Sequence, residues 1–453
     1  FDTVSRAWYL EDTWEVSDAL TISAGIRNEV FENYNGVGEL FYDIEDQWAP
    51  RLALSWTPGG TGEQRINLNW GRYHLPLLGF PNIFLGSSYL DYLRYFVYDG
   101  NRDERTAVPV AIGADGIPTT QEIGTIFYWG DGSVPDTRGL LDTTLKPMYQ
   151  DEWIIAYERE LGADWTVGVR YVNRELKSLI EDVSTFAGLE AIGFPGAIDF
   201  SQPCAWVMTN PGTDITTFCD SDGDGELEEW TIPADALGYP KARREYEAID
   251  VTFSKRFGDD WSVTGSYTWS KNKGNIEGSV KSDLGQDMAN VTQDFDSPLM
   301  MDGAYGYLPN DRRHKLRFWA MYQATDRLML SARLFAQSGR PINAFGTEHP
   351  DGLPPYENAD TFYLLQPDGS LEFKPRGTSG RTAWVTQVDL AAIYAFSWGD
   401  RSSVELRAEV FNLFNSDSET EVYERYERRP DQFLLPNHYH QPRQLRFGIA
   451  MRF

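Results

Sequence analysis

Apolar and polar residues alternate strictly in many segments of this chain. In the last ten residues, 444–453, large apolar side chains at Leu445, Phe447, Ile449 and Met451 alternate with polar or small ones. Such alternation is typical of β-strands, in which successive side chains point to opposite faces of a sheet. The sequence predicts an all-β fold with thirteen strands, at about 4–16, 19–32, 49–57, 64–74, 149–160, 164–180, 243–257, 260–274, 313–324, 327–339, 383–397, 402–414 and 442–453.

The predicted connections alternate between two lengths. Every second one is a tight turn, such as WGDR at 398–401, and the others are long, at about 33–48, 75–148, 181–242, 275–312, 340–382 and 415–441. Compact soluble domains rarely contain several loops this long. Short turns at one end of the strands and long loops at the other are the usual layout of an outer-membrane barrel. We therefore predict a transmembrane antiparallel β-barrel with short periplasmic turns and long extracellular loops.

Two observations indicate which face of the sheet meets lipid. In 261–270, one face carries Trp261, Val263, Tyr267 and Trp269, and the other carries only serine and threonine. Four tryptophans lie beside tight turns, at Trp14, Trp165, Trp261 and Trp398. Tryptophans at that level are typical of the interfacial belt of a membrane protein, although they could also cap a core. The pattern favours an apolar face toward lipid, a polar face toward the lumen, and a closed sheet, because lipid cannot hydrate unpaired strand edges.

Composition excludes several classes of function. The formal net charge of −28 is unfavourable for a nucleic-acid partner, because a phosphate-binding surface is cationic. No run of 18 apolar residues indicates a transmembrane helix. The chain contains no G-x-S-x-G elbow, P-loop or HExxH motif, so we do not expect an enzyme. It begins FDTVSRAWYL, as if already inside a strand, and we expect a fragment or a part of a longer protein.

Several motifs resemble those of the TonB-dependent receptors of the Gram-negative outer membrane. VFNLFN at 410–415 and the terminal FGIAMRF are similar to general features of that family, and LPNDRRH at 308–314 and SGRPIN at 338–343 resemble its Oar-like branch. The resemblance implies a barrel of about twenty-two strands around an N-terminal plug. Residues 1–453 would then be the C-terminal portion of one barrel domain, without the plug, the TonB box and about nine first strands.

The same resemblance implies a transport function. A TonB-dependent receptor moves a substrate across the outer membrane by energy-coupled plug gating, with outer-membrane lipid and the TonB–ExbB–ExbD complex as partners. A surface lipoprotein or a protein substrate is a further partner to expect, and no cofactor is required. The terminal Phe453 resembles the signal that marks outer-membrane barrels for assembly. Two alternatives stay open: a barrel that acts in adhesion or binding without transport, and, more remotely, a secreted carbohydrate-active β protein.

The segment CDSDGDGELEEW, 219–230, contains the most specific local motif. Asp220, Asp222 and Asp224 followed by a glycine match the first half of a calcium loop, which supplies the oxygen ligands that Ca²⁺ prefers. Thr231 stands where the closing glutamate of an EF-hand would be, so Glu226 and Glu228 are the remaining candidate ligands. An acidic, solvated loop is the alternative. The two cysteines, Cys204 and Cys219, are expected to form a local disulfide, with two free thiols as the alternative.

The loops 75–148 and 181–242 are the candidates for substrate contact. The first is rich in aromatic residues that could stack on a substrate or simply pack the loop: Phe84, Tyr89, Tyr92, Tyr95 and Phe96. Arg312, Arg313 and His314 are expected to tie loops to carboxylates rather than to bind a ligand. His438 and His440 share one face of a possible strand, but too few ligands accompany them for a metal site.

Overall fold

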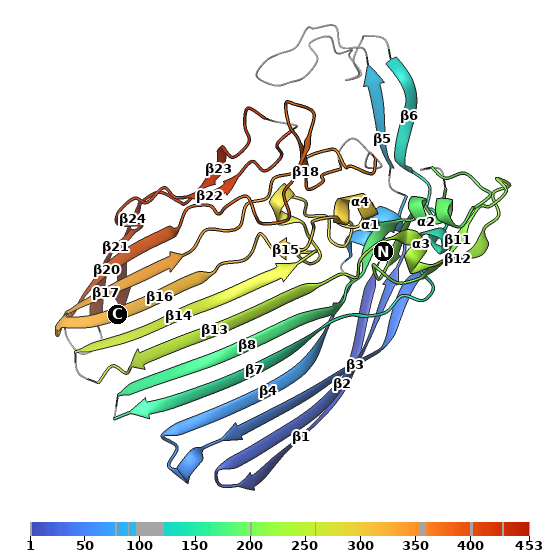
Figure 1. The fold of residues 1–453 in the computed structure, drawn as a ribbon. Coiled ribbons are helices and arrows are strands. Elements are labelled where there is room, and N and C mark those ends of the chain that lie inside the picture. The colour runs from blue at the N-terminus through green and yellow to red at the C-terminus, as the bar shows by residue number, and fades with distance from the viewer. Residues whose placement is uncertain are drawn as a thin grey trace.

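One large antiparallel sheet forms the body of the molecule (Figure 1). The computed structural model describes residues 2–452 except 78, 89, 97–121, 163, 200–201, 259, 353–358, 399–401 and 428–429. Thirteen strands follow one another across the sheet, and the short β15 (Gly306–Tyr307) pairs beside β14. The thirteen are β1 (Thr3–Ser17), β2 (Leu20–Tyr34), β3 (Leu40–Trp56), β4 (Gln64–Leu75), β7 (Met148–Leu161), β8 (Trp165–Ser178), β13 (Arg244–Lys255), β14 (Trp261–Gly274), β16 (His314–Thr325), β17 (Leu328–Gln337), β20 (Val385–Trp398), β21 (Ser402–Phe411) and β24 (Gln444–Arg452). Each corresponds to a strand predicted from the sequence.

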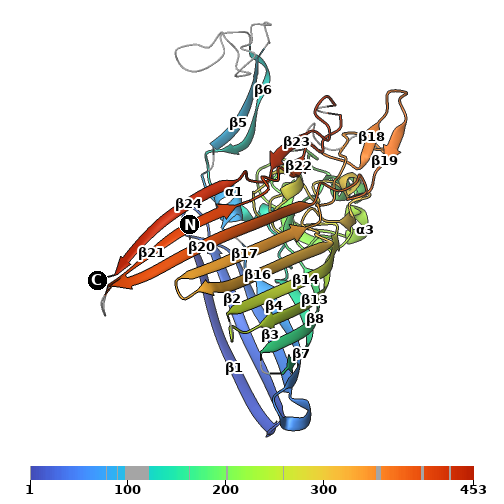
Figure 2. The same ribbon diagram turned by 90° about the vertical axis from the view of Figure 1, so that its left-hand side faces the viewer.

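The sheet curves like the wall of a barrel, as Figures 1 and 2 show from two sides. Tight turns join the strands at one end, and the long connections lie at the other end. The strand order begins at β1 and ends at β24, and within the described residues no pairing joins these two strands. The expected all-β architecture is confirmed, with β1 and β24 as the two edges of the described wall.

The pairing register divides the sheet into two faces. Between β14 and β16, Ser262 lies opposite Met321 and Thr264 lies opposite Trp319, while Val263 pairs with Ala320 on the other side. Following this register through the sheet puts the serines and threonines of β14 on one face with most charged residues of the neighbouring strands. We call this polar side the inner face and the opposite side the outer face.

The outer face exposes a continuous band of large apolar residues. Between 40% and 76% of the surface of each of the following residues is exposed: Leu52, Ile155, Val251, Leu406 and Phe447. Water would make such a band unfavourable, whereas hydrocarbon would not. Trp14, Trp165 and Trp261 are exposed at the turn end of this face, where Trp165 and Trp261 contact each other edge-on. The side chain of Trp398 lies outside the described part.

The connection predicted at 33–48 is wrong. β2 runs to Tyr34 and β3 begins at Leu40, so only residues 35–39 form the loop. The register shifts between Glu29 and Phe31, near Asp46, whose φ is 56°. This irregularity breaks the alternation and hides the strand from a pattern of period two. The extra strand residues rise above the rest of the sheet, where Phe41 and Ile44 are buried.

Five long loops, 76–147, 179–243, 275–313, 338–384 and 412–443, form what we call the cap. They contain α1 (Phe80–Leu85), β5 (Leu90–Phe96), β6 (Glu122–Asp131), β9 (Glu181–Ser184), α2 (Phe186–Ala191), β10 (Trp206–Thr209), β11 (Ile215–Cys219), β12 (Glu228–Ile232), α3 (Ala234–Leu237), α4 (Pro298–Met301), β18 (Tyr363–Leu365), β19 (Leu371–Phe373), β22 (Glu419–Val422) and β23 (Pro436–Tyr439). The cap loops also contain the 3-10 turns η2 (Thr137–Leu140) and η3 (Ser282–Leu284), whereas η1 (Pro58–Gly60) lies in the tight turn between β3 and β4. Fully buried side chains from four of these loops, including Ile180, Met208, Phe295 and Phe362, share one hydrophobic core. No helix in the described part is long and apolar enough to cross a membrane.

Candidate functional site

Ion pairs cross the inner face of the sheet from strand to strand. Arg170 of β8 bonds Asp250 of β13 at 2.6 Å, and Arg174 of β8 bonds Glu152 of β7. Further along the sheet, Arg446 of β24 pairs with Glu409 of β21. These arginine side chains are 41–64% exposed, so each pair adds little to stability. They show that the inner face is a wet, charged surface, as expected for a lumen.

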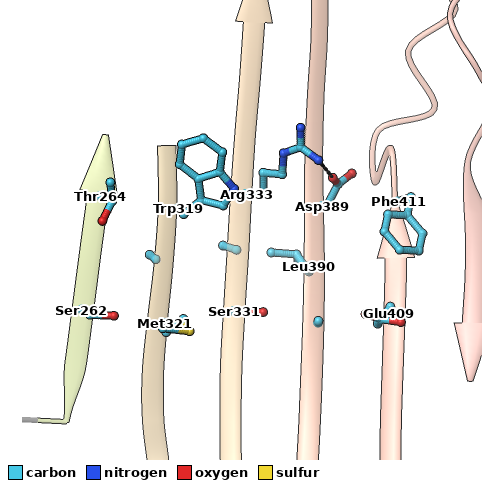
Figure 3. A pocket seen from close by; sticks show the side chains of 13 residues that line it. Ser262, Thr264, Trp319, Met321, Ser331, Arg333, Asp389, Leu390, Glu409 and Phe411 are labelled. Carbon is cyan, nitrogen blue, oxygen red and sulfur yellow. Dashed lines mark ion pairs between the residues drawn. The ribbon is translucent and has the colours of Figure 1, made fainter. Parts of the chain in front are cut away.

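A hollow of about 420 Å³ opens on the inner face between β14 and β21 (Figure 3). Trp319, Met321 and Phe411 supply its apolar surface. Arg333 and Asp389 reach toward each other across it, with 3.9 Å between charged atoms. The hollow therefore offers an apolar seat with charged groups beside it, which suits a polypeptide or an organic ligand inside the lumen.

A buried ion network connects two cap loops. Arg376 in loop 338–384 is 1% exposed. Its guanidinium donates to Asp283 at 3.3 Å and to Asp294 at 3.2 Å, both in loop 275–313. Lys281 donates to the same Asp294 at 2.7 Å. Although burial opposes ionisation, Lys281 and Arg376 hold the pKa of Asp294 below its usual value.

A second buried pair joins a third loop. Arg340 donates to Glu424 of loop 412–443 at 2.7 Å. Asn343 bridges the two groups, because its amide donates to Asp283 at 2.9 Å and to Glu424 at 3.4 Å. Burial raises the pKa of Glu424 to about 8, against the opposing effect of Arg340. These buried hydrogen bonds and ion pairs link loops 275–313, 338–384 and 412–443, so the three loops form one unit.

Two further buried carboxylates lie in the cap, on β9. Burial raises the pKa of both Glu181 and Asp182 well above the usual range. The negative charge of Asp182 raises the pKa of Glu181 further, and that of Asp296 does the same for Asp182. Glu181 accepts a hydrogen bond from the backbone N–H of Thr292 in the next cap loop. Sequence reasoning did not find these groups or the Arg376 network. Their sequence signal is no more than single charges in polar loops, and their partners lie far away along the chain.

The predicted calcium motif forms the exposed tip of the β11–β12 hairpin. One carboxylate oxygen from each of Asp220, Asp222 and Asp224 lies within 4.8 Å of the others. Asp220 also accepts the backbone N–H groups of Gly223 at 2.7 Å and Gly225 at 3.1 Å, which holds the loop tightly curled. Three carboxylates at this spacing could hold a hard cation.

The two candidate glutamates are not part of that group. Glu228 begins β12 and instead accepts hydrogen bonds from the backbone and side chain of Ser221, while Glu226 donates its backbone N–H to Asp224. A disulfide between Cys204 and Cys219 joins β11 to the segment before β10. Both cysteines are fully buried, and Cys219 directly precedes the acidic tip, so the disulfide anchors one end of the tip to the cap.

The aromatic candidates for substrate contact lie on a hairpin that projects beyond the cap (Figures 1 and 2). Tyr92 and Tyr95 on β5 are 44% and 54% exposed, and Phe96 ends the strand. Arg94 pairs with Glu122 of β6 at 2.6 Å and steadies the ribbon. Phe84 belongs to α1, but its side chain is not described. Tyr89 and the predicted assembly signal Phe453 lie outside the described residues.

The Arg312–His314 segment differs partly from expectation. Arg313 lies 3.7 Å from Asp311, as predicted for a link to a carboxylate. Arg312 instead donates to the backbone carbonyls of Pro309 and Asp311. His314 bonds the Tyr267 hydroxyl at 2.7 Å and stacks on aromatic rings. The expectation is thus right for Arg313 and wrong for its two neighbours.

The two histidines near the C-terminus belong to no metal cluster in the part of the chain that the structure describes. His438 lies 3.0 Å from Glu421, and the backbone N–H of His440 donates to Ser418. Across the same residues, the aspartate group of the β11–β12 hairpin is the one set of three potential ligands close enough to hold an ion.

Comparison with known proteins agrees with this architecture. Residues 35–336 match the family model described as an outer membrane beta barrel domain. The TonB-dependent transporter Oar of Myxococcus xanthus is 26% identical over 438 residues, which are 93% of this chain. The chain spans 36% of the length of that relative. This similarity confirms the resemblance to the Oar-like receptors.

Two solved structures were compared with the chain. The FpvAI receptor in its complex with pyocin S2 superimposes with a TM-score of 0.50 at 12% identity, over 99% of this chain and 39% of that one. The ferric-catecholate import receptor Fiu from E. coli K12 gives a TM-score of 0.49 at 13% identity, over 100% of this chain and 45% of that one. The family match covers most of the chain and agrees with the apolar outer face and wet inner face. The chain belongs to the outer membrane beta barrel domain family, and it resides in the outer membrane of a Gram-negative bacterium.

Proposed function

We propose that this chain is the C-terminal part of the barrel of a TonB-dependent outer-membrane transporter. The observation that carries the proposal is the similarity to Oar, a TonB-dependent transporter, along 93% of the chain. The wet inner face fits a protein through which polar substrates pass. A plug and the TonB-binding segment would belong to a part of the protein beyond these 453 residues.

In this proposal, the β5–β6 hairpin, the cap and the plug would act at successive stages of transport. Substrate would first meet the projecting β5–β6 hairpin, where Tyr92, Tyr95 and Phe96 offer aromatic surface. It would then pass the cap into the lumen. A plug would rest against the inner face, and the hollow around Trp319 and Phe411 would receive one of its side chains. A pull from TonB–ExbB–ExbD on the plug would open the path, so gating rather than bond chemistry would be the mechanism.

Edge strands support the idea of a larger barrel. β1 and β24 each present one row of backbone groups that no strand pairs within the described residues. Such groups are costly in lipid, so further strands must cover both edges. In the proposed protein, about nine strands that precede Phe1 would close the ring between β1 and β24.

The test uses the native protein purified from its own outer membrane. We expect an intact mass far above that of this chain, a plug sequence at its N-terminus, and binding to the periplasmic domain of TonB in a pull-down. A control protein from which the TonB-binding segment is deleted should lose that binding. A mature chain that starts at Phe1, or a full-length protein that does not bind the periplasmic domain of TonB, would exclude the proposal and favour the adhesion alternative.

We also propose that the β11–β12 tip holds a calcium ion between Asp220, Asp222 and Asp224. Support comes from the hard oxygen ligands and from their spacing in the folded hairpin. Glu226 and Glu228 could complete the shell only after a rearrangement, because Glu228 now bonds Ser221. Bound calcium would stiffen a surface loop; no catalytic role is implied.

A further inference from the structure

Two aromatic rings at the cap end of the outer face are surrounded by cationic side chains. Trp269, Lys271 and Lys273 occupy alternate positions of β14, in phase with the exposed Trp261 at the turn end of that strand, so all three belong to the outer face. The register places Tyr307 of β15 beside Lys273 on the same face (Figure 1). The ammonium group of Lys271 lies 4.8 Å from the ring centre of Trp269. That of Lys273 lies 4.5 Å from the ring centre of Tyr307.

Two arginines from neighbouring cap loops reach the same rings. The guanidinium carbon of Arg313, just before β16, lies 4.8 Å from the ring centre of Tyr307 and 5.9 Å from that of Trp269. The guanidinium carbon of Arg381, in the loop that leads to β20, lies 5.7 Å from the ring centre of Tyr307. Three cationic groups therefore lie within about 11 Å of one another around a single ring. We call the following four residues the rim cluster: Lys271, Lys273, Arg313 and Arg381.

The rim cluster carries more positive charge than the carboxylates beside it neutralise. Asp311, whose side chain is fully buried, pairs with both arginines of the cluster. Glu247 and Glu245 lie opposite the two lysines in the register, but Glu245 already pairs with Arg243, and Glu247 accepts the Tyr171 hydroxyl at 2.9 Å. Within the described residues, no carboxylate oxygen lies within 4.0 Å of either lysine ammonium. Even if Asp311 and Glu247 are both counted, two of the four positive charges stay unmatched.

The rim cluster lies at the level of the extracellular membrane interface. Trp269 follows Trp261 by eight residues on β14, which is roughly 27 Å along a strand that rises about 3.4 Å per residue. With a strand tilt of about 40°, the two tryptophans are about 20 Å apart across the membrane, close to the height of the apolar band of an outer-membrane barrel. His314 pairs with Trp269 in the register and stacks on the exposed Trp384, which continues the upper aromatic level. The cluster is therefore placed where lipid headgroups meet water.

We propose that the rim cluster binds the phosphate groups of lipopolysaccharide, the phosphorylated glycolipid of the outer leaflet. Guanidinium groups offer paired N–H donors that match phosphate oxygens, and the two lysines add mobile point charges. On the side of the cluster that faces the turns, Tyr267 and Leu316 pair on the outer face and are exposed, so acyl chains can lie against them. A lipid with a phosphorylated headgroup matches both surfaces, whereas free phosphate would use only the cations.

The arrangement differs from ordinary interfacial anchoring. Single lysines and arginines at a membrane interface extend separately to keep their charges in water. Here Lys271 and Lys273 of β14 converge with an arginine from loop 275–313 and another from loop 338–384. One bound headgroup would therefore link the wall to two cap loops from outside. This role does not rest on the transport proposal, because it applies equally to a barrel that acts in adhesion.

The experiment is native mass spectrometry of the purified full-length protein in detergent, titrated with diphosphorylated lipid A. We expect saturable binding, and affinity at least about tenfold weaker for lipid A from which the phosphates have been removed. Lys271→Gln combined with Lys273→Gln should weaken binding of the phosphorylated lipid by a similar factor. Lys271→Arg combined with Lys273→Arg should keep the affinity within about threefold, because both charges are retained.

The matched control combines Lys177→Gln with Arg243→Gln. It also removes two positive charges, but these two residues are paired with the outer-face carboxylates of Glu175 and Glu245. Binding of the phosphorylated lipid should therefore stay within about twofold of that of the unmodified protein. Inorganic phosphate is the second control, and it should bind far more weakly than the lipid because it has no acyl chains.

Equal affinities of the unmodified protein for the two forms of lipid A would overturn the proposal, and this comparison does not depend on the folding of any variant. Equal losses in the Lys271/Lys273 variant and the Lys177/Arg243 control would also overturn it, because net charge alone would then explain binding. If inorganic phosphate binds as tightly as the lipid, the assignment to a lipid is wrong. Failure of the TonB pull-down with intact lipid binding would reject transport but not this site.

Discussion

The wall and the cap of this molecule are stabilised in opposite ways. The wall exposes its large apolar residues on one face and its ion pairs on the other, as with Phe447 and the Arg446–Glu409 pair. The cap buries both kinds of group, with Phe362 and Arg376 packed in its interior. Lipid is the solvent for the apolar face of the wall, whereas the cap stands in water and needs its own core.

This difference shows where single substitutions should matter. In the wall, the arginines of the ion pairs stay exposed to water, so replacing one of them should change stability little. In the cap, each buried charge depends on its partner, because an unpaired charge cannot be hydrated there.

Arg376→Met should destabilise the cap by about 3 to 5 kcal/mol, because it leaves Asp283 and Asp294 buried with Lys281 as their remaining cation. Native-state hydrogen exchange of the cap loops measures the effect. The matched wall variant, Arg333→Met, removes a half-exposed arginine that lies 3.9 Å from Asp389. Asp389 keeps its hydrogen bonds from Gln387 and Asn412, so stability should change by less than about 1 kcal/mol. Equal effects of the two variants would contradict the contrast between cap and wall.

Leu406→Arg should destabilise the wall by about 2 to 4 kcal/mol, because it puts a charge on the lipid face. Its neighbour Arg407 points to the inner face, and Arg407→Leu should have a much smaller effect. Urea unfolding in lipid vesicles compares the two. The assignment of the faces would be reversed if Arg407→Leu proved the more damaging change.

Removal of the disulfide by Cys204→Ser and Cys219→Ser should weaken loop 179–243 by about 3 kcal/mol, since the bridge closes a loop of 15 residues. Limited proteolysis should then cut this loop faster while the wall strands stay intact. The reduced unmodified protein serves as a second sample. Unchanged cleavage in both samples would show that core packing alone holds the loop.

The cap should lose about 2 kcal/mol of stability between about pH 6 and about pH 8, because Glu424 has a folded-state pKa of about 8. Its pKa is raised by burial, so the folded state binds the proton more tightly than the unfolded state does. Stability is therefore highest at low pH and falls as the pH rises toward the folded pKa. Glu424→Gln should flatten this dependence of cap hydrogen exchange, and an equally steep slope in the variant would assign it to Glu181 or Asp182.

About 5 mM Ca²⁺ should stabilise the β11–β12 tip by about 1 kcal/mol if the site has millimolar affinity. The measurement is the rate of proteolysis within 219–230 with and without the ion. Mg²⁺ and the Asp222→Asn variant are the controls, and both should give little protection. Protection that persists in Asp222→Asn would place the ion elsewhere on the protein.

Strand positions were predictable because alternation is a property of each strand alone. β14 shows its two faces in ten consecutive residues, and β21 and β24 show theirs over ten and nine residues. The segment 40–48 was not recognised as a strand for two reasons. A bulge near Asp46 interrupts the period-two alternation. The first part of β3 also packs against buried residues of the cap and not against lipid, so its apolar residues do not mark a lipid-facing side. The calcium motif was visible for the same local reason, since its three aspartates lie in five residues.

The sequence by itself determined most of the wall: thirteen strands, the alternation of tight turns and long loops, and the two faces of strands such as β14, because period two survives without knowledge of any partner. Only the tertiary structure decided the charged interior of the cap. Arg376 meets Asp283 across 93 residues of sequence, and Arg340 meets Glu424 across 84. Whether a charge is matched depends on such distant neighbours, which no local pattern records.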